Sequence, residues 1–156
     1  SGIPYTILRN GWYTENYTAS IPDTLAAGAF AGSAGEGKIS SATREDYAEA
    51  AAVVLTGEGH QDKLYELAGD ESYTLGELAA EVSRQTGKDI PYNNLAEGEY
   101  ADALKSRGLP EGLAKTIAGW DTGIAGNDLY DESKTLSRLI GRPTTPLATA
   151  VKEALA

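Results

Sequence analysis

The chain contains two or three strand-like segments, and long helix-containing stretches separate them. The segments occupy residues 3–9 (IPYTILR), 63–69 (KLYELAG) and 89–95 (DIPYNNL). The first contains β-branched and aromatic residues, and the second alternates apolar and polar residues as a strand does. Strands joined by such long crossovers pair in parallel, and the alternation of strands with helices predicts an α/β fold. So few strands do not make a doubly wound sheet. We therefore expect part of a parallel sheet whose remaining strands lie elsewhere.

The intervening segments carry clear helix signals. Thr43 or Ser41 can cap a helix within residues 41–57, where acidic residues of the first turn suit the helix dipole. Thr74 is followed three residues later by Glu77, which is the spacing of a capping box at the start of a second helix. Both segments predict helices that pack against a sheet.

The remaining segments show weaker patterns. Residues 15–27 predict a loop and a short helix, and the glycine-rich residues 28–40 predict a flexible loop or hairpin. A phosphate cradle is the alternative for residues 28–40, but the spacing of a P-loop and its Lys-Ser/Thr pair are missing. Two helices are expected within residues 97–120, a loop at 121–130, and two short helices in the remaining C-terminal sequence.

Charge and composition exclude several function classes. The chain has 156 residues, enough for one domain, and a formal net charge of −10 from 13 Lys and Arg against 23 Asp and Glu. Because duplex binding rests on many basic contacts to phosphate, we expect no nucleic-acid partner. A small anionic ligand responds mainly to the groups around its own pocket and is not excluded. Without cysteine, neither a disulfide framework nor cysteine catalysis is expected.

Targeting and metal signals are sparse. No apolar run approaches the roughly 20 residues that cross a bilayer, and the first residues lack the pattern of a signal peptide. We therefore expect a cytoplasmic protein without a membrane partner. His60, the single histidine, lies in a turn-like segment and is expected to be an exposed loop residue.

Polar and aromatic residues follow the first strand directly. In an open parallel sheet, ligands bind beyond the carboxyl ends of the strands. Asn10 and Gly11 can turn sharply and present amide groups to a ligand, and Trp12 and Tyr13 offer flat faces to an aromatic ring. The alternative is a strand-ending turn in which the two aromatic side chains fill a gap in the core.

Four segments in one order resemble the C-terminal half of a known protein type: SGIPYTILRNGWYTENY, GKISSATREDYAEAAA, KLYELAGDESYTLGELAAE and DESKTLSRLIGRPTTPL. The resemblance is to the bacterial NAD(P)H:quinone oxidoreductase 2 type of the NmrA-like, atypical short-chain dehydrogenase/reductase family, and it spans essentially the whole chain. It implies that residues 1–70 form the C-terminal part of an NAD(P)-binding Rossmann-like domain. Residues 71–156 would form a smaller, mostly helical substrate-binding region, with segments that can interleave.

The resemblance also implies a cofactor, a substrate and a binding loop. The cofactor is NADP(H) and the substrate is a quinone, and no catalytic acid or base is required because the cofactor carries the hydride chemistry. The residues expected at the nicotinamide end of the cofactor cleft are Asn10, Gly11, Trp12, Tyr13, Thr14 and Glu15.

Two further positions are interpreted through the resemblance. Arg44 matches a position from which a basic side chain near a helix start approaches the cofactor or orders the binding loop; the alternative is an exposed helix-cap arginine. The Tyr-x-x-x-Lys spacing of ordinary short-chain dehydrogenases occurs as Tyr130 and Lys134. The resemblance places that pair in a peripheral helix, so we do not expect it to be catalytic.

The sequence departs from the family by lacking the G-x-x-G-x-x-G fingerprint and the helix start that binds the pyrophosphate. The expectation is a fragment of an NAD(P)H-dependent quinone oxidoreductase. It would be completed by the missing N-terminal Rossmann half or by another copy of the chain. The resemblance implies enzyme activity for the full-length parent and leaves open whether this chain acts alone. The alternative is an NmrA-like redox sensor or regulator that binds the dinucleotide without turnover.

Overall fold

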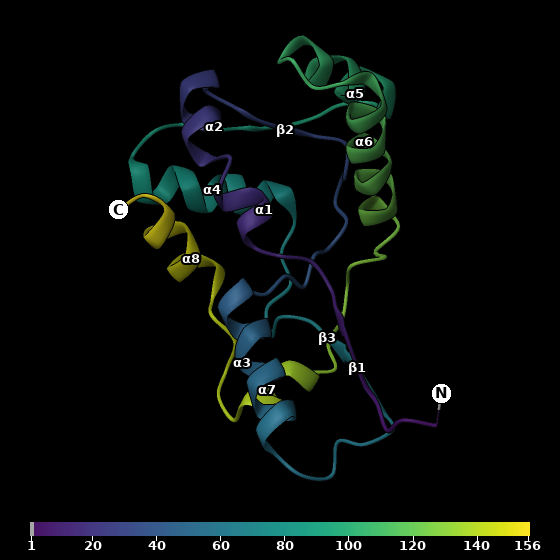
Figure 1. The fold of residues 1–156 in the computed structure, drawn as a ribbon. Coiled ribbons are helices and arrows are strands. Elements are labelled where there is room, and N and C mark those ends of the chain that lie inside the picture. Colours follow the sequence, from purple (N-terminus) through teal and green to yellow (C-terminus); the bar gives the residue numbers. More distant parts are fainter. Residues whose placement is uncertain (1) are drawn as a thin grey trace.

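Two separate pairs of parallel strands organise the chain. The computed structural model describes residues 2–156, which contain four strands and eight helices (Figure 1). We call the part around the first strand pair the strand section and the part around the second pair the helical section. The strand section contains β1 (Thr6–Asn10), α3 (Arg44–Thr56), β3 (Lys63–Leu67) and α7 (Thr135–Ile140).

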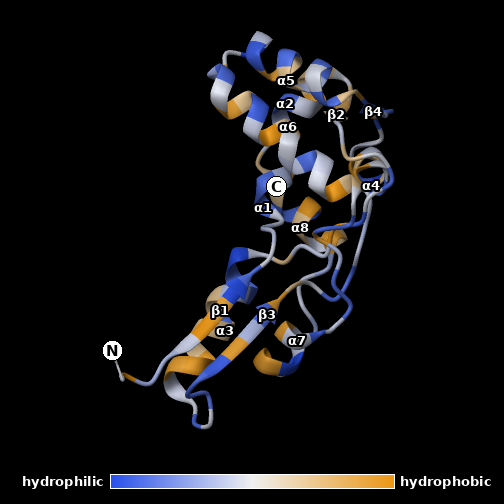
Figure 2. Ribbon diagram, turned by 90° about the vertical axis from the view of Figure 1, so that its right-hand side faces the viewer, coloured by the Kyte–Doolittle hydropathy of each residue, from blue (hydrophilic) through white to orange (hydrophobic). Residues whose placement is uncertain are grey.

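In the strand section, β1 and β3 pair in parallel, with Ile7 opposite Leu64. Helix α3 is the crossover between them, and it packs with α7 against one face of the strands, where Leu8 and Tyr65 lie. The opposite face carries Ile7 and Leu64, which are 43% and 51% exposed. The strand section is therefore buried on one face only. Figure 2 shows the hydrophobic colouring of residues along β1 and β3.

The helical section forms the larger core. Its strands are β2 (Phe30–Gly32) and β4 (Tyr92–Asn94), and its helices are α1 (Glu15–Thr18), α2 (Ile21–Ala27), α4 (Leu75–Thr86), α5 (Glu97–Ser106), α6 (Glu111–Ala125) and α8 (Leu147–Ala154). Helix α4 buries Leu75, Leu78 and Val82 on one side, each at most 1% exposed. Helices α5 and α6 pack against each other on the far side of β2 (Figure 1).

The expected α/β class is confirmed, and so are the two strongest helix starts. Thr74 accepts a hydrogen bond from the backbone of Glu77, and the Glu77 carboxylate accepts one from the backbone of Thr74, which completes the capping box. The Thr43 hydroxyl accepts the backbone N–H of Asp46 at the start of α3. These helix starts need only local hydrogen bonds, which is why the sequence predicts them.

Two of the expected loops are wrong. Residues 121–130 do not form a loop throughout, because α6 continues to Ala125 and its Ile124 is 1% exposed. Residues 28–40 form no hairpin, because β2 lies within them and pairs in parallel with β4. Glycines obscured both elements, since glycine weakens helix and strand patterns alike.

His60 also differs from expectation. It is half-buried rather than exposed, and its Nδ1 lies 2.8 Å from the hydroxyl of Tyr65.

A buried acid links the two sections. Asp46 on α3 is fully buried, and its carboxylate contacts Arg142 at 2.8 Å. It also accepts hydrogen bonds from the backbone and hydroxyl of Thr145 and from the hydroxyl of Thr43. The segment before α8 is thereby fixed to the strand section, while α8 itself packs on α4 in the helical section.

Among the helices described, none combines the length and the apolar character that a bilayer-spanning segment requires.

Candidate functional site

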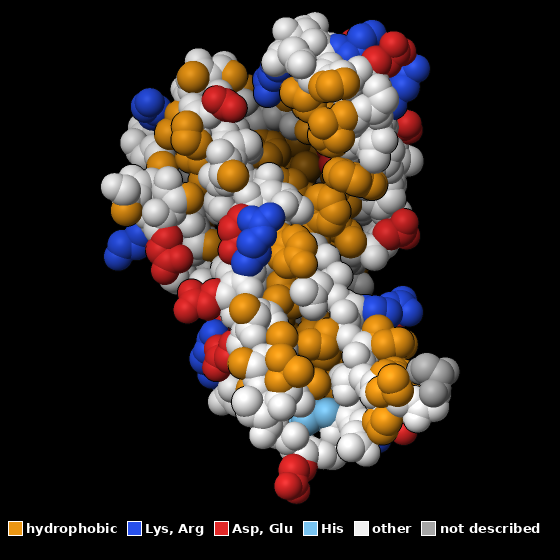
Figure 3. Space-filling model, in the orientation of Figure 1, with side chains coloured by type: hydrophobic (Ala, Val, Ile, Leu, Met, Phe, Trp, Pro, Cys, Tyr) orange, Lys and Arg blue, Asp and Glu red, His pale blue; other side chains and the backbone are white. Residues whose placement is uncertain are grey.

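A cavity of about 660 Å³ opens in the helical section. It lies between α1 and α2 on one side and α5 and α6 on the other, and Figure 3 shows it as a hollow with hydrophobic side chains around it. Its aromatic lining comes from elements far apart in the sequence: Trp12, Tyr13, Tyr17, Phe30, Tyr100 and Trp120. Such a wall suits a flat, apolar molecule, because ring faces and edges pack well against one another.

Both tryptophans of the chain belong to this wall. Trp12 and Trp120 meet edge to face, with ring centroids 5.5 Å apart, and Trp12 also lies against Tyr17 at 6.4 Å. Trp120 is 47% exposed, which is unusual for so large an aromatic side chain. The loop after β1 and helix α6 therefore contact each other at the cavity through these two tryptophans.

One buried carboxyl faces this aromatic surface. Asp121 on α6 is 6% exposed, and its Oδ2 accepts the backbone N–H of Ser33 at 2.7 Å. Burial raises the pKa of the Asp121 carboxyl, and the Ser33 hydrogen bond offsets this only in part. The close approach depends on Gly32, because a Cβ there would lie 2.8 Å from Oδ2.

Two tyrosines near Asp121 keep their protons at neutral pH. Burial raises the pKa of Tyr100 to about 12, and the charge of Asp121 adds to this effect. Burial also raises the pKa of Tyr17, with smaller contributions from Tyr73 and Asp121. Both hydroxyls are therefore hydrogen-bond donors rather than acids under ordinary conditions.

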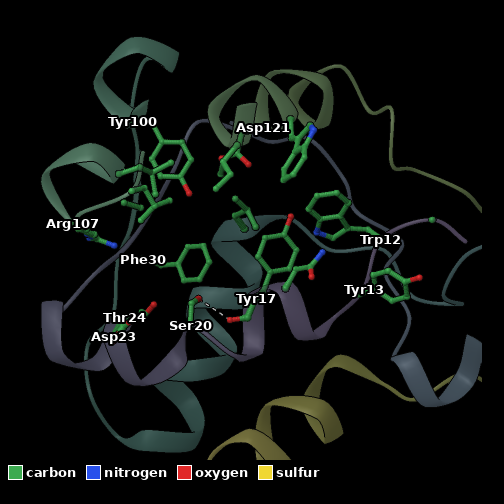
Figure 4. A pocket seen from close by; sticks show the side chains of 18 residues that line it. Trp12, Tyr13, Tyr17, Ser20, Asp23, Thr24, Phe30, Tyr100, Arg107 and Asp121 are labelled. Atoms are coloured by element: carbon green, nitrogen blue, oxygen red, sulfur yellow. Dashed lines mark hydrogen bonds between the residues drawn. The ribbon is translucent and has the colours of Figure 1, made fainter. Parts of the chain in front are cut away.

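Two buried donors in the wall have no hydrogen-bond partner among the described residues. They are the Nε1 of Trp12 and the hydroxyl of Tyr17. Unpaired buried polar groups are rare in proteins and carry a free-energy cost. In Figure 4 these side chains surround the same opening as Phe30, Tyr100 and Asp121. Both atoms are enclosed by protein, so in this conformation they do not face a molecule in the cavity.

The residues predicted from the sequence separate into two groups. Gly11, Trp12 and Tyr13 line the cavity. Asn10 lies just outside it, in a second hollow at the carboxyl ends of β1 and β3 that shares Gly11 with the cavity. The Nδ2 of Asn10 donates to the hydroxyl of Tyr13 at 3.3 Å. The loop after β1 thus connects the strand ends with the aromatic cavity.

Thr14, Glu15 and Arg44 lie behind this loop and hold it. The Thr14 hydroxyl lies 2.8 Å from the hydroxyl of Ser41, and the Glu15 carboxylate accepts the backbone N–H of Arg44 at 2.8 Å. The guanidinium of Arg44 lies 5.0 Å from the ring centre of Tyr13, in cation–π geometry. Arg44 is exposed at the first position of α3, and it contacts the loop through Tyr13 and Glu15. A contact of Thr14, Glu15 or Arg44 with a cofactor stays a prediction.

Sequence reasoning missed the residues of the far wall. Tyr100 comes from α5, and Trp120 and Asp121 come from α6. Because a loop was expected at residues 121–130, Asp121 was not assigned to a helix. The useful signal was the helical spacing of Ile117, Trp120 and Ile124, which continues past the predicted helix end.

The residues present fit only one end of a dinucleotide. The loop of Gly11, Trp12 and Tyr13 adjoins both hollows, so a nicotinamide ring placed there would reach the aromatic cavity. No glycine-rich phosphate loop occurs in the sequence, and a pyrophosphate needs such backbone donors at a helix start.

Comparison with known proteins gives a consistent set of relatives, although no protein-family model matches the chain. Quinone oxidoreductase 2 of Escherichia coli (strain K12) is 59% identical over 151 residues, which are 97% of this chain and 53% of that protein. The crystal structure of the NADPH-dependent quinone oxidoreductase from E. coli complexed with NADPH matches with a TM-score of 0.96 and 57% identity. That match covers 99% of this chain and 55% of the other.

A second solved structure is more distant in sequence. The triphenylmethane reductase of Citrobacter sp., complexed with NADP(H), matches with a TM-score of 0.92 and 36% identity, over 97% of this chain and 53% of that chain. The chain spans about half the length of the curated relatives it matches.

Proposed function

Since the chain belongs to the NAD(P)H:quinone oxidoreductase 2 type of the NmrA-like, atypical short-chain dehydrogenase/reductase family, we propose that it forms the substrate side of an NADPH-dependent quinone reductase. Its cavity holds the quinone, and the loop after β1 holds the nicotinamide ring. The observation that carries this proposal is the aromatic cavity, which begins at the loop that follows a parallel strand.

The wall chemistry supports a quinone. A quinone is flat and largely apolar, and it carries two carbonyl oxygens that accept hydrogen bonds. The edge-to-face pair of Trp12 and Trp120 suits the ring, and the protonated hydroxyl of Tyr100 in the cavity lining suits the oxygens. Bound NADPH would supply the hydride, and the residues of this chain would orient the acceptor and exclude water.

The dinucleotide phosphates require residues that this sequence does not supply. We propose that a Rossmann half with a glycine-rich loop covers the open face of β1 and β3 and adds strands at the free edge of β1. The relatives are about twice as long as this chain, and Ile7 and Leu64 remain exposed on that face. Parallel sheets are normally covered on both faces, which supports such a partner.

In this arrangement, residues 1–70 belong mainly to the dinucleotide-binding domain and residues 71–156 mainly to the substrate region. The exceptions are α7, which packs on α3, and α1, α2 and β2, which line or support the cavity.

The test is NADPH oxidation by the full-length natural polypeptide with a small benzoquinone. Trp12→Ala should lower the rate, because it removes a wall of the cavity beside the nicotinamide position. Leu113→Ala, at an exposed position of α6 outside the cavity, is the control and should leave the rate unchanged. Tight NADPH binding without quinone-dependent oxidation across several acceptors would refute the reductase and favour a redox sensor.

A further inference from the structure

Asp121 is held in one orientation at the wall of the cavity. The Ser33 N–H binds its Oδ2, and the described residues give the other carboxyl oxygen, Oδ1, no hydrogen bond and no ion pair. Gly32 leaves the space for this arrangement, since any side chain there would collide with Oδ2 and with Leu75. The carboxyl is therefore fixed by backbone on one side and available to a ligand on the other.

The groups around Asp121 do not compensate a negative charge. Tyr17 from α1, Tyr92 from β4 and Tyr100 from α5 face it, and burial raises the pKa of all three, so they stay neutral. Besides Asp121, the charged residues of the cavity lining are Asp23 and Arg107, and both are exposed. Burial of a carboxyl without a compensating cation raises its pKa.

From this placement we propose that Asp121 is the proton donor of quinone reduction in this cavity, a role that rests on the function proposed above. A quinone seated against Trp12 and Trp120 would lie close to the carboxyl, because Asp121 lines the same cavity. Asp121 would then touch the substrate oxygen itself.

Bound NADPH would supply a hydride, that is two electrons and one proton, so that the quinone becomes a hydroquinone monoanion and the cofactor is oxidised to NADP⁺. Asp121 gives its carboxyl proton to the phenolate oxygen, so that an O–H bond forms there and the carboxylate remains. Water at the open side of the cavity returns a proton to Asp121 before the next turnover.

Tyr17 and Tyr100 are less suited to this step. A general acid works best when its pKa lies near the working pH, and burial moves both tyrosine pKa values above the ordinary range. The pKa of Asp121 is moved from the acid side toward neutrality. The hydroxyl of Tyr100 is better placed to orient the acceptor by donating a hydrogen bond.

The first experiment measures binding, separately from turnover. Both tryptophans line the cavity, so the intrinsic fluorescence of the chain reports on this site. Titration with a small benzoquinone should quench it saturably. Asp121→Asn should bind the quinone within about threefold of the wild type, because the amide keeps the shape and still accepts the Ser33 N–H. Linear quenching without saturation in the wild type would refute quinone binding and hence the proposed function.

The second experiment measures turnover and its pH profile in the full-length natural polypeptide with NADPH. Asp121→Asn should lower kcat roughly a hundredfold, within the range that general acid catalysis supplies. The wild-type rate should fall as the pH rises through the pKa of Asp121, and this limb of the pH–rate profile should be absent in Asp121→Asn. Asp121→Glu should restore part of the rate together with the limb. Leu113→Ala on the same helix is the matched control.

The outcomes separate the two proposals. A wild type that reduces quinone while Asp121→Asn matches its rate and pH profile would overturn the donor role and leave the reductase intact. A slow Asp121→Asn variant that keeps the wild-type pH limb would show that Asp121 acts only on structure. A carboxylic acid C=O band in infrared spectra at neutral pH, present in the wild type and lost in Asp121→Asn, supports the protonated donor; its absence counts against it.

Discussion

The helical section and the strand section bury their apolar residues to different extents. In the helical section, Leu75, Leu78 and Val82 of α4 are almost fully buried, and Ile124 and Val151 complete the core from α6 and α8. In the strand section, α3 and α7 cover one face of β1 and β3, but Ile7 and Leu64 on the other face remain about half exposed.

The two sections differ in how much of their apolar surface their own helices cover. A parallel sheet has apolar residues on both faces and is stable when both are covered. The helical section supplies both sides of its core from its own helices, whereas the strand section supplies only one. The cavity lies in the complete section and begins at the loop that leaves the incomplete one. The following variants test this difference between the two sections.

The largest effect is expected in the core of the helical section. Leu78→Ala should destabilise the protein by about 2–5 kcal/mol, because it leaves a cavity in a fully packed core. Urea unfolding followed by tryptophan fluorescence measures this change. Leu55→Ala on α3, at a site 85% exposed, is the control and should stay within about 0.5 kcal/mol of the wild type. Equal losses of unfolding free energy in Leu78→Ala and Leu55→Ala would contradict the difference in burial between the two sections.

The next largest loss of unfolding free energy is expected at the contact between Asp46 and Arg142, which links the two sections. Arg142→Ala leaves the carboxylate of Asp46 buried without its cation and should cost about 2–3 kcal/mol in unfolding free energy. Arg9→Ala removes the exposed ion pair with Glu66 on the open face, and its cost should stay below about 1 kcal/mol. Denaturant midpoints of both variants compare them directly, and a larger loss for Arg9→Ala would contradict the buried link.

The open face of the strand section should matter for association rather than for stability. Ile7→Lys should leave the unfolding free energy of this chain within about 0.5 kcal/mol, since Ile7 is half exposed. It should weaken binding to the proposed Rossmann half, supplied as a separate chain, by about tenfold or more. Sedimentation velocity measures both assembly and affinity. Unchanged affinity would show that this face is not the contact surface.

The smallest effect concerns pH. The folded-state pKa of Asp121 is raised, chiefly by burial. A raised carboxyl pKa contributes stability that is fully present below the unfolded-state pKa and is lost as the pH rises through the folded-state value. Asp121→Asn does not titrate, so its stability relative to the wild type should increase over that window. Thermal unfolding at several pH values tests this sign; a stability of the variant relative to the wild type that falls as the pH rises would contradict it.

The sequence predicted the elements that depend on near neighbours. The capping box of Thr74 and Glu77 and the cap at Thr43 both act over a few residues. The turn expected at Asn10 and Gly11 is wrong, because β1 runs through Asn10 and the Gly11 N–H continues the strand pairing by donating to the carbonyl of Leu67. The position of Gly11, Trp12 and Tyr13 beside a hollow was also expected, because the carboxyl end of a parallel strand is a common place for a ligand.

The α/β class, the helix caps and the strand before Gly11, Trp12 and Tyr13 follow from the amino-acid pattern. Which side chains face the loop after that strand depends on the fold. Trp120 meets Trp12 across more than a hundred positions, Asp121 lines the same cavity, and Gly32 makes room for the carboxyl that Ser33 holds. Capping hydrogen bonds and propensities act between near neighbours, whereas burial and the pKa of Asp121 arise from atoms that the fold alone brings together.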